Sequence, residues 1–157
     1  MINTESSIKN YFMILIDSKP LAEIKAEGVR IFPDECCGFL FGSEQADGTR
    51  TISKIRVVDN AKPGDKRRRF EISAKDYMQA ERFALENDVL LLGIYHSHPN
   101  HPAIPSEHDR VAAQPWFSYV IISVMQGQFD HIRSWKLNED SKFEEENISS
   151  VHLNKIT

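Results

Sequence analysis

The chain has 157 residues, a hydrophobic content of 41% and a net charge of −4, from 19 basic and 23 acidic side chains. Such a length suits one domain with a single core, and the weakly acidic balance provides no electrostatic footprint for nucleic acid. Segment 1–7 lacks the basic start of a signal peptide, and the apolar run 11–16 is too short to cross a bilayer. We therefore expect a cytoplasmic protein with neither nucleic acid nor membrane as a partner.

Hydrophobic periodicity and turn residues predict helices that alternate with strands. In chain order, we expect a strand over 11–17, a helix over 20–30, strands over 37–42 and 51–58, a short strand over 69–72, a helix over 73–87, a buried strand over 89–94, a helix over 106–114, and strands over 119–125 and 131–137. The second and third strands, and the last two, are separated by turn-forming residues, which predicts two hairpins. The expected fold class is α/β, a single domain with a mixed β-sheet sandwiched by helices.

The folded domain is predicted to cover residues 11–140, after an N-terminal tail over 1–10. Residues 141–157 contain the acidic run Glu144-Glu145-Glu146 and are expected to form a C-terminal tail or an edge strand.

The two cysteines of the chain, Cys36 and Cys37, are adjacent. A single adjacent pair provides no disulfide framework, and no C-x-x-C motif accompanies it that would favour zinc ligation. We expect both thiols to be reduced and buried at the start of a strand.

The most informative pattern is Tyr95-His96-Ser97-His98-Pro99, directly after the buried strand. Side chains of a strand alternate between its faces, so His96 and His98 project from the same side while Ser97 points away. A lone histidine at a strand end is more often a hydrogen-bonded structural residue than a ligand. Two convergent imidazoles, however, form half of a metal site.

The second half of the site should come from Ser106 and Asp109, which follow His98 after a proline-rich segment. They are spaced three apart in the first turn of a predicted helix and share a face. The same pair matches the S-x-x-D form of a capping box, in which Ser106 caps the helix. Capping the helix and facing a metal are compatible roles for this pair.

Zinc is the metal that this donor set favours, because a catalytic zinc site uses three protein ligands and keeps its fourth position for water. We assign His96, His98 and Asp109 as the ligands. Zinc lowers the pKa of bound water to about 7, so that the water becomes a nucleophile when a nearby base takes its proton. Iron and manganese also accept two imidazoles and a carboxylate.

The candidate base is Glu35, at the entrance to the apolar strand over 37–42. A glutamate before a glycine-containing apolar strand, followed by H-S-H-P and S-x-x-D, resembles the motif of the JAMM (MPN+) metalloproteases. No position of the motif is substituted, and the resemblance covers about residues 12–137. The resemblance implies a layout similar to that of cytidine deaminases. It also implies Glu35 as general acid and base, His96, His98 and Asp109 as zinc ligands, and Ser106 as the group that steadies the water and the oxyanion.

The resemblance is closest to short, stand-alone prokaryotic members that process ubiquitin-like sulfur carriers. The adjacent cysteines and the run 98–103 also resemble this branch. It implies a zinc peptidase or isopeptidase that hydrolyses an amide bond at the C-terminal Gly-Gly end of a ubiquitin-like or sulfur-carrier protein, which would be its partner. The interpretation is also compatible with a homodimer.

Three other functions were weighed against this interpretation. A general small-peptide metallopeptidase of the same fold would use the same site on unrelated peptides. A non-catalytic MPN binding scaffold would be expected to lose ligands, and the intact motif argues against it. A zinc deaminase would need H-x-E and P-C-x-x-C, which the chain lacks.

Some residues near the motif have no assigned role. The basic segment Lys62–Arg69 is typical of a solvated loop, and its contact with substrate is a hypothesis. His101 and His108 do not fit the ligand pattern, and Trp116 and Phe117 are expected in the core or at an interface.

Overall fold

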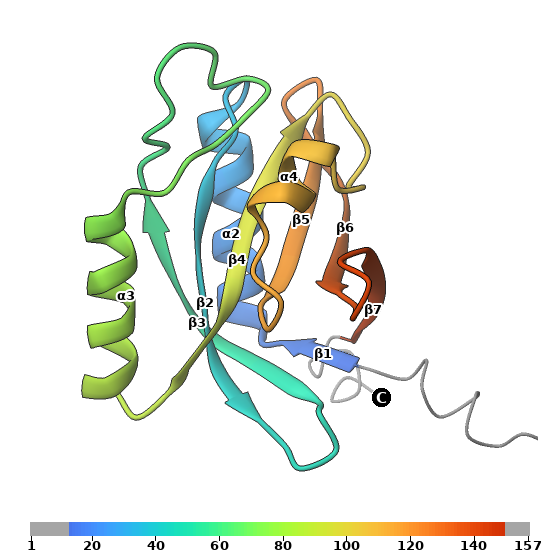
Figure 1. Cartoon of the computed structure of the whole chain (residues 1–157). Helices are drawn as coiled ribbons and strands as arrows, with labels where there is room; N and C mark the ends of the chain where they lie inside the picture. Colours follow the sequence, from blue (N-terminus) through green and yellow to red (C-terminus); the bar gives the residue numbers. More distant parts are fainter. Residues whose placement is uncertain (1–12, 150–157) are drawn as a thin grey trace, which may run out of the picture.

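The computed structural model describes residues 13–149 (Figure 1). Its elements are β1 (Met13–Ile16), α2 (Ser18–Ile31), β2 (Cys37–Glu44), β3 (Arg50–Val58), α3 (Ala74–Glu86), β4 (Leu90–Pro99), α4 (Glu107–Ala112), β5 (Ser118–Met125), β6 (Gln128–Leu137) and β7 (Phe143–Ser149). The predicted tail over 1–10 lies outside the described residues, as does the segment 150–157. None of the helices within 13–149 is long and apolar enough to cross a membrane.

The strands form one mixed sheet in the order β1-β3-β2-β4-β5-β6-β7, and β7 pairs in parallel with β1, which closes the sheet into a barrel. The predicted single α/β domain with a mixed sheet is confirmed, but the sheet closes into a barrel instead of forming a simple sandwich with the helices. The closing strand β7 lies in the segment expected to be a tail or an edge strand, and it has a neighbour on both sides. The acidic run 144–146 suggests a solvated segment. Glu146, however, is buried and accepts a hydrogen bond from Ser134 Oγ at 2.9 Å.

The two longer helices cover opposite faces of the sheet. Along β2, Leu40 packs in the cluster that contains Ile24 of α2, whereas Phe39 and Phe41 pack in the cluster that contains Ala80 of α3. This alternation is the two-residue period of a strand. Figure 1 accordingly shows α2 behind the central strands and α3 to their left.

Most predicted elements are confirmed, with ends shifted by a few residues, and both predicted hairpins form as β2–β3 and β5–β6. The strand predicted over 69–72 is wrong. That segment is a loop whose backbone pairs locally, with Ala61 N donating to Glu71 O at 2.8 Å. The buried strand β4 extends beyond the apolar run 89–94 to Pro99, so both motif histidines lie within it, at its C-terminal end as predicted.

The pairing of β2 with β4 positions the site. These strands are antiparallel, with Cys37 opposite His96. Ser97 then fixes the next position, because its N–H donates to Cys36 O at 3.2 Å and its Oγ accepts from Cys36 N at 2.8 Å. Glu35 precedes Cys36 in the chain, so this register carries it to the level of His98.

Candidate metal centre

Three donor atoms from two segments meet at the end of β4. His96 Nε2 and His98 Nε2 are 3.2 Å apart, and Asp109 Oδ2 lies 3.4 Å from the first and 3.2 Å from the second. A tetrahedral zinc ion with bonds of about 2.0–2.1 Å separates its ligand atoms by about 3.3–3.4 Å. The triangle therefore has the dimensions of three ligands of a tetrahedral ion, and the residues present fit such a metal.

The tautomer of His98 is set by the segment that follows β4. His98 Nδ1 lies 2.8 Å from Pro102 O. A carbonyl oxygen only accepts, so Nδ1 carries the hydrogen and Nε2 presents its lone pair to the centre. Metal-binding histidines commonly have this arrangement, in which the outer nitrogen donates to a backbone carbonyl.

Outside its contacts with the other donor atoms, the ring of His96 is held by packing, and its outer nitrogen makes no hydrogen bond among the described residues. Its ring is buried and stacks on Phe70, with 4.5 Å between the ring centroids and an angle of 28°. Burial lowers the pKa of His96 despite the nearby charge of Asp109, which favours the neutral imidazole that a metal requires. Its Nδ1 is buried without a hydrogen-bond partner among the described residues.

Asp109 is oriented by the first turn of α4. Ser106 Oγ accepts from Asp109 N at 3.0 Å, and Asp109 Oδ2 accepts from Ser106 N at 2.9 Å, which completes the capping box. Burial alone would raise the pKa of Asp109, but the adjacent imidazoles of His96 and His98 bring it well below its usual range. The carboxylate oxygen that closes the capping box is thus the same oxygen that contacts both imidazoles.

Glu35 lies against the histidine pair, as the pairing of the strands requires. A carboxylate oxygen of Glu35 and one ring nitrogen from each of His96 and His98 all lie within 4.8 Å of one another. The side chain is 3% exposed, and its Oε1 is buried without a hydrogen-bond partner among the described residues. Burial of the carboxyl and, to a lesser extent, the charge of Asp109 raise the pKa of Glu35 to about 9. A cation in the centre would oppose that rise.

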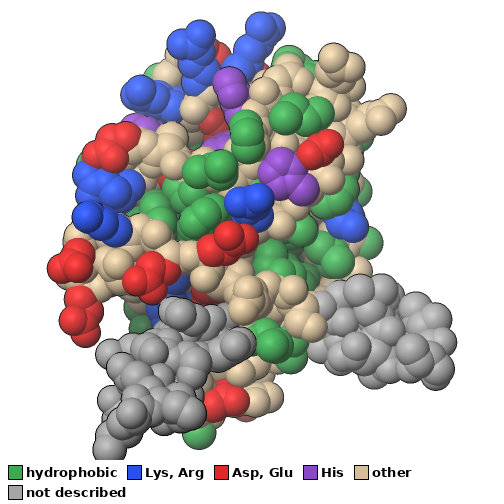
Figure 2. Space-filling model, turned by 90° about the vertical axis from the view of Figure 1, so that its right-hand side faces the viewer, with side chains coloured by type: hydrophobic (Ala, Val, Ile, Leu, Met, Phe, Trp, Pro, Cys, Tyr) green, Lys and Arg blue, Asp and Glu red, His purple; other side chains and the backbone are tan. Residues whose placement is uncertain are grey.

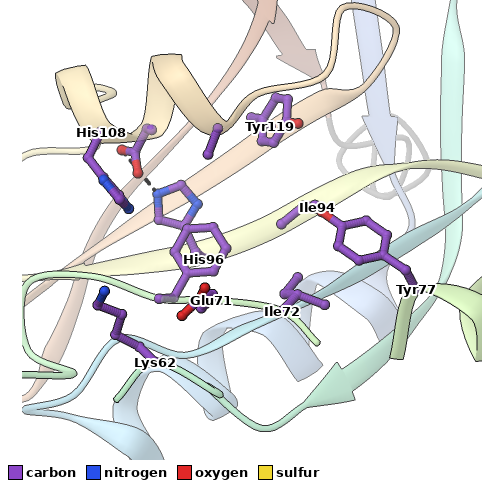
Figure 3. A pocket seen from close by; sticks show the side chains of 11 residues that line it. Lys62, Glu71, Ile72, Tyr77, Ile94, His96, His108 and Tyr119 are labelled. Carbon is purple, nitrogen blue, oxygen red and sulfur yellow. Dashed lines mark ion pairs between the residues drawn. The ribbon is translucent and has the colours of Figure 1, made fainter. Parts of the chain in front are cut away.

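A cavity of about 240 Å³ opens beside the donor atoms. His96 and Asp109 line it, and its walls are largely apolar, with Phe70, Ile72, Tyr77, Ile94 and Tyr119 among the lining residues. Figure 3 shows Tyr77 and Tyr119 reaching in from α3 and β5, with Lys62 and His108 on the side nearer His96. The candidate metal centre therefore borders a largely apolar recess that Lys62 also lines.

Several residues that support the site were missed by sequence reasoning. Asn60, at the end of β3, donates through Nδ2 to the carbonyl oxygens of Glu35, at 3.2 Å, and Arg69, at 3.0 Å. Trp135 Nε1 donates to Ala103 O at 2.9 Å, and His131 Nε2 accepts from Ala103 N at 2.9 Å, which fixes the segment that carries Pro102. No short-range pattern marks these contacts, because each joins residues distant in the chain.

The other residues singled out in the sequence lie outside the donor set. His108 lines the cavity, and His101 is exposed. Phe117 packs in the core on the α3 side, whereas Trp116 is 43% exposed and lies beneath the guanidinium of Arg50.

The cysteines are free and buried, as predicted. Burial raises the pKa of Cys36 to about 12 and raises that of Cys37 as well. Neither thiol has the lowered pKa of a reactive nucleophile.

Two imidazoles from a strand, a carboxylate from the following helix and a buried glutamate from the segment just before the neighbouring strand are typical of a metallohydrolase. Residues 18–138 match the family described as prokaryotic homologs of the JAB domain. The chain belongs to this family, which confirms the JAMM resemblance, and it is a hydrolase of the JAMM type.

Relatives with assigned activities are similar over most of their length. A desampylase of Pyrococcus furiosus is 30% identical over 114 residues, which cover 73% of this chain and 74% of the relative. A CysO-cysteine peptidase of Mycobacterium tuberculosis is 24% identical over 135 residues, 85% of this chain and 89% of the relative. Among solved structures, a protein of Desulfitobacterium hafniense matches with a TM-score of 0.77 and 28% identity, over 88% of this chain and 92% of that one. A protein of Salinibacter ruber matches with a TM-score of 0.67 and 36% identity, over 86% and 90%.

Proposed function

We propose that this protein is a zinc-dependent peptidase or isopeptidase that hydrolyses the amide bond at the C-terminal Gly-Gly end of a ubiquitin-like or sulfur-carrier protein. The observation that carries the proposal is the triangle of donor atoms beside a buried carboxyl, formed by His96, His98 and Asp109 next to Glu35. The names of the relatives, desampylase and CysO-cysteine peptidase, support the substrate class.

The ligands in this proposal are His96, His98 and Asp109. When bound, zinc supplies a Lewis acid that polarises the scissile carbonyl and lowers the pKa of a water molecule. The ligands suit this role because His98 presents Nε2 in a fixed tautomer, His96 is held neutral by burial, and Asp109 is ionised.

Glu35 moves the proton in the proposed reaction. With a pKa raised to about 9 by burial, its carboxyl is poorly suited to accept a proton at neutral pH, and a neighbouring cation brings the pKa down to where it can both accept and donate. The water oxygen bonds to the carbonyl carbon as Glu35 accepts a proton. That proton passes to the leaving nitrogen as the C–N bond breaks, which yields a carboxylic acid and an amine.

Ser106 stabilises the oxyanion in this proposal. Its Oγ accepts from Asp109 N, so the hydroxyl hydrogen remains available to a substrate oxygen. The side chain is exposed at the start of α4 while its backbone is fixed by the capping box. A donor that is oriented before substrate arrives is the kind that stabilises a developing negative charge.

The apolar cavity next to His96 supports a narrow C-terminal tail as the substrate. A Gly-Gly end has no side chains and can bring its backbone close to buried atoms. An apolar side chain that precedes it would find a matching surface on Phe70, Ile72 and Tyr77. The predicted specificity is for a flexible, slender end of a protein rather than for a folded loop.

The test is intact-mass analysis of a sulfur carrier that ends in Gly-Gly with one added C-terminal residue. The carrier is incubated with zinc-loaded wild type, with Glu35→Gln, and with Glu86→Gln, an exposed glutamate of α3 that serves as the matched control. We expect release by wild type and the control and none by Glu35→Gln. Release by Glu35→Gln would remove Glu35 from its role, and no release by any enzyme, with unrelated peptides cleaved instead, would favour a general peptidase.

A further inference from the structure

The segment that joins β3 to α3 has an unusual charge. Residues 60–71, here called the 60–71 loop, contain Lys62, Lys66, Arg67, Arg68 and Arg69, and their acidic residues are Asp65 and Glu71. The side chains of residues 66–69 are exposed. In Figure 2, Lys and Arg side chains gather at the top of the molecule, where Figure 1 places this loop, and most of the visible Asp and Glu side chains lie lower. A chain with a net charge of −4 thus has one strongly basic end.

The cations of the loop are left largely unpaired. Within the described residues, the one ion pair that a loop cation makes joins Arg68 Nε to Asp65 Oδ2, at 3.9 Å and with both side chains well exposed. Exposed pairs of this length contribute little to stability. The charge therefore does not serve to hold the loop together.

Hydrogen bonds to backbone groups, rather than ion pairs, hold the loop next to Glu35. Asn60 Oδ1 accepts from the backbone N–H groups of Lys62, at 3.0 Å, and Glu71, at 3.1 Å, so it binds both limbs of the loop. Its Nδ2 binds Glu35 O and Arg69 O, and Glu35 N donates to Lys66 O at 2.7 Å. The backbone of Glu35 is therefore joined to the loop at both its N–H and its carbonyl.

The loop also forms part of the substrate cavity. Lys62, Phe70 and Glu71 all line the cavity that borders His96. The exposed side chains at 66–69 directly precede Phe70 of the cavity wall, and we expect the folded body of a protein whose C-terminal tail enters the cavity to lie near them. Opposite charge on that body would be attracted to them.

We propose that the 60–71 loop is a docking surface for an acidic face of the folded substrate protein, next to the tail that is cleaved. The inference rests on the proposed function and specifies its partner: a small protein with clustered Asp and Glu side chains beside a flexible C-terminus. Attraction of this kind accelerates encounter and lowers KM, and salt weakens it. The chemistry on the bound tail is independent of it.

The test compares a whole carrier with its own tail. The substrates are an acidic ubiquitin-like carrier that ends in Gly-Gly plus one residue, and the ten-residue peptide of the same C-terminus. The enzymes are wild type, the triple variant Arg67→Glu, Arg68→Glu, Arg69→Glu, and a control triple with the same change of charge on exposed cations of α2, β3 and α3, namely Lys19→Glu, Lys54→Glu, Arg82→Glu. Each variant is assayed at low and high salt.

We expect the loop triple to raise KM for the carrier by about tenfold at low salt, and to alter peptide cleavage by less than about twofold. The control triple should resemble wild type on both substrates. A carrier with its acidic face changed to lysine should be a poor substrate of wild type and a better one of the loop triple.

The possible failures are distinguishable. Equal cleavage of the carrier by wild type and the loop triple, or the same loss in the control triple, would overturn the docking surface and leave the proposed function standing. Equal losses of cleavage by the loop triple on carrier and peptide would show that the loop acts on the chemical step and would overturn its role in docking. Failure of wild type on both substrates would overturn the proposed function and the inference with it.

Discussion

The two halves of the proposed metal centre are built in different ways. His96 and His98 lie on β4, which is paired on both sides and buried from Leu92 to Pro99. Asp109 lies on α4, a helix of 6 residues with none buried. The histidine half is therefore fixed by the sheet, whereas the aspartate half is fixed by a few side-chain hydrogen bonds.

The segment between the halves shows the same dependence on individual contacts. Ala103 exchanges hydrogen bonds with Trp135 and His131, and Ser123 Oγ donates to His101 O at 2.6 Å. Few of the contacts that hold α4 and this segment are backbone pairs of the sheet. We conclude that changes on the α4 side should weaken metal binding with little effect on global stability, whereas changes around β4 should affect both.

The largest effect is expected from removal of a ligand on either side. Asp109→Ala and His96→Ala should each lower kcat/KM by about 10³-fold or more, with loss of bound zinc. The two variants should differ in structure, because Asp109→Ala also breaks the capping box. Amide exchange should accelerate in α4 of Asp109→Ala and remain unchanged there in His96→Ala. An active, zinc-loaded Asp109→Ala would contradict the assigned ligand set.

Glu35 should make the stability of the metal-free protein depend on pH. Its pKa is raised from 4.5 to about 9 by burial, so the folded state retains a proton that the unfolded chain releases above pH 4.5. The free energy of unfolding should therefore fall as pH rises towards 9, by up to about 1.4 kcal/mol per pH unit from this group. Glu35→Gln lacks this contribution.

Urea unfolding in chelator at pH 5 and pH 8 checks this expectation. The stability of Glu35→Gln relative to wild type should increase from the lower to the higher pH. Parallel pH profiles for the two proteins would show that the carboxyl is not buried as described.

A smaller effect is expected from the support of the segment around Ala103. Trp135→Phe removes the indole N–H that donates to Ala103 O and retains an aromatic ring. We expect zinc affinity to fall by about tenfold, as for other contacts that orient ligands, with the unfolding midpoint nearly unchanged. Competition with a chelator measures the affinity. Trp116→Phe, which changes an indole that is 43% exposed, is the control and should retain wild-type affinity.

The smallest effect should follow from Asn60→Asp. This change removes the two Nδ2 donors to Glu35 O and Arg69 O while it retains an acceptor for both limbs of the loop. We expect kcat to fall about threefold to tenfold on a short tail peptide, with KM little changed, because Glu35 would be less well positioned. Asn147→Asp on the exposed part of β7 is the control. A change confined to KM would show that Asn60 acts on substrate binding alone.

Sequence reasoning was most successful where a short pattern determines geometry. The alternation of a strand placed His96 and His98 on one face, and the S-x-x-D spacing predicted the capping box that orients Asp109. Glu35 could be proposed only through the family resemblance, because its approach to the histidines depends on the register of β2 against β4.

The missed features depend on contacts between distant segments. The sequence predicts a tail or an edge strand over 141–157, but not the pairing of β7 on both sides, since Glu144 and Glu145 resemble a solvated segment. The segment 69–72 has the apolar content of a strand, yet Phe70 and Ile72 serve as cavity wall rather than as members of a sheet. In both cases the surroundings, not the local composition, decide the structure.

The closed ring of strands has a consequence for synthesis. Met13 of β1 pairs with Asn147 of β7, and Leu15 pairs with Ser149, so the first of the described strands has as its neighbour the last of them. Until β7 has been made, β1 can pair with β3 alone, and β6 presents an unpaired edge. The barrel can therefore close only when nearly the whole domain has been translated. A nascent chain that is stalled or cleaved before residue 143 would display open strand edges, which chaperones and proteases recognise.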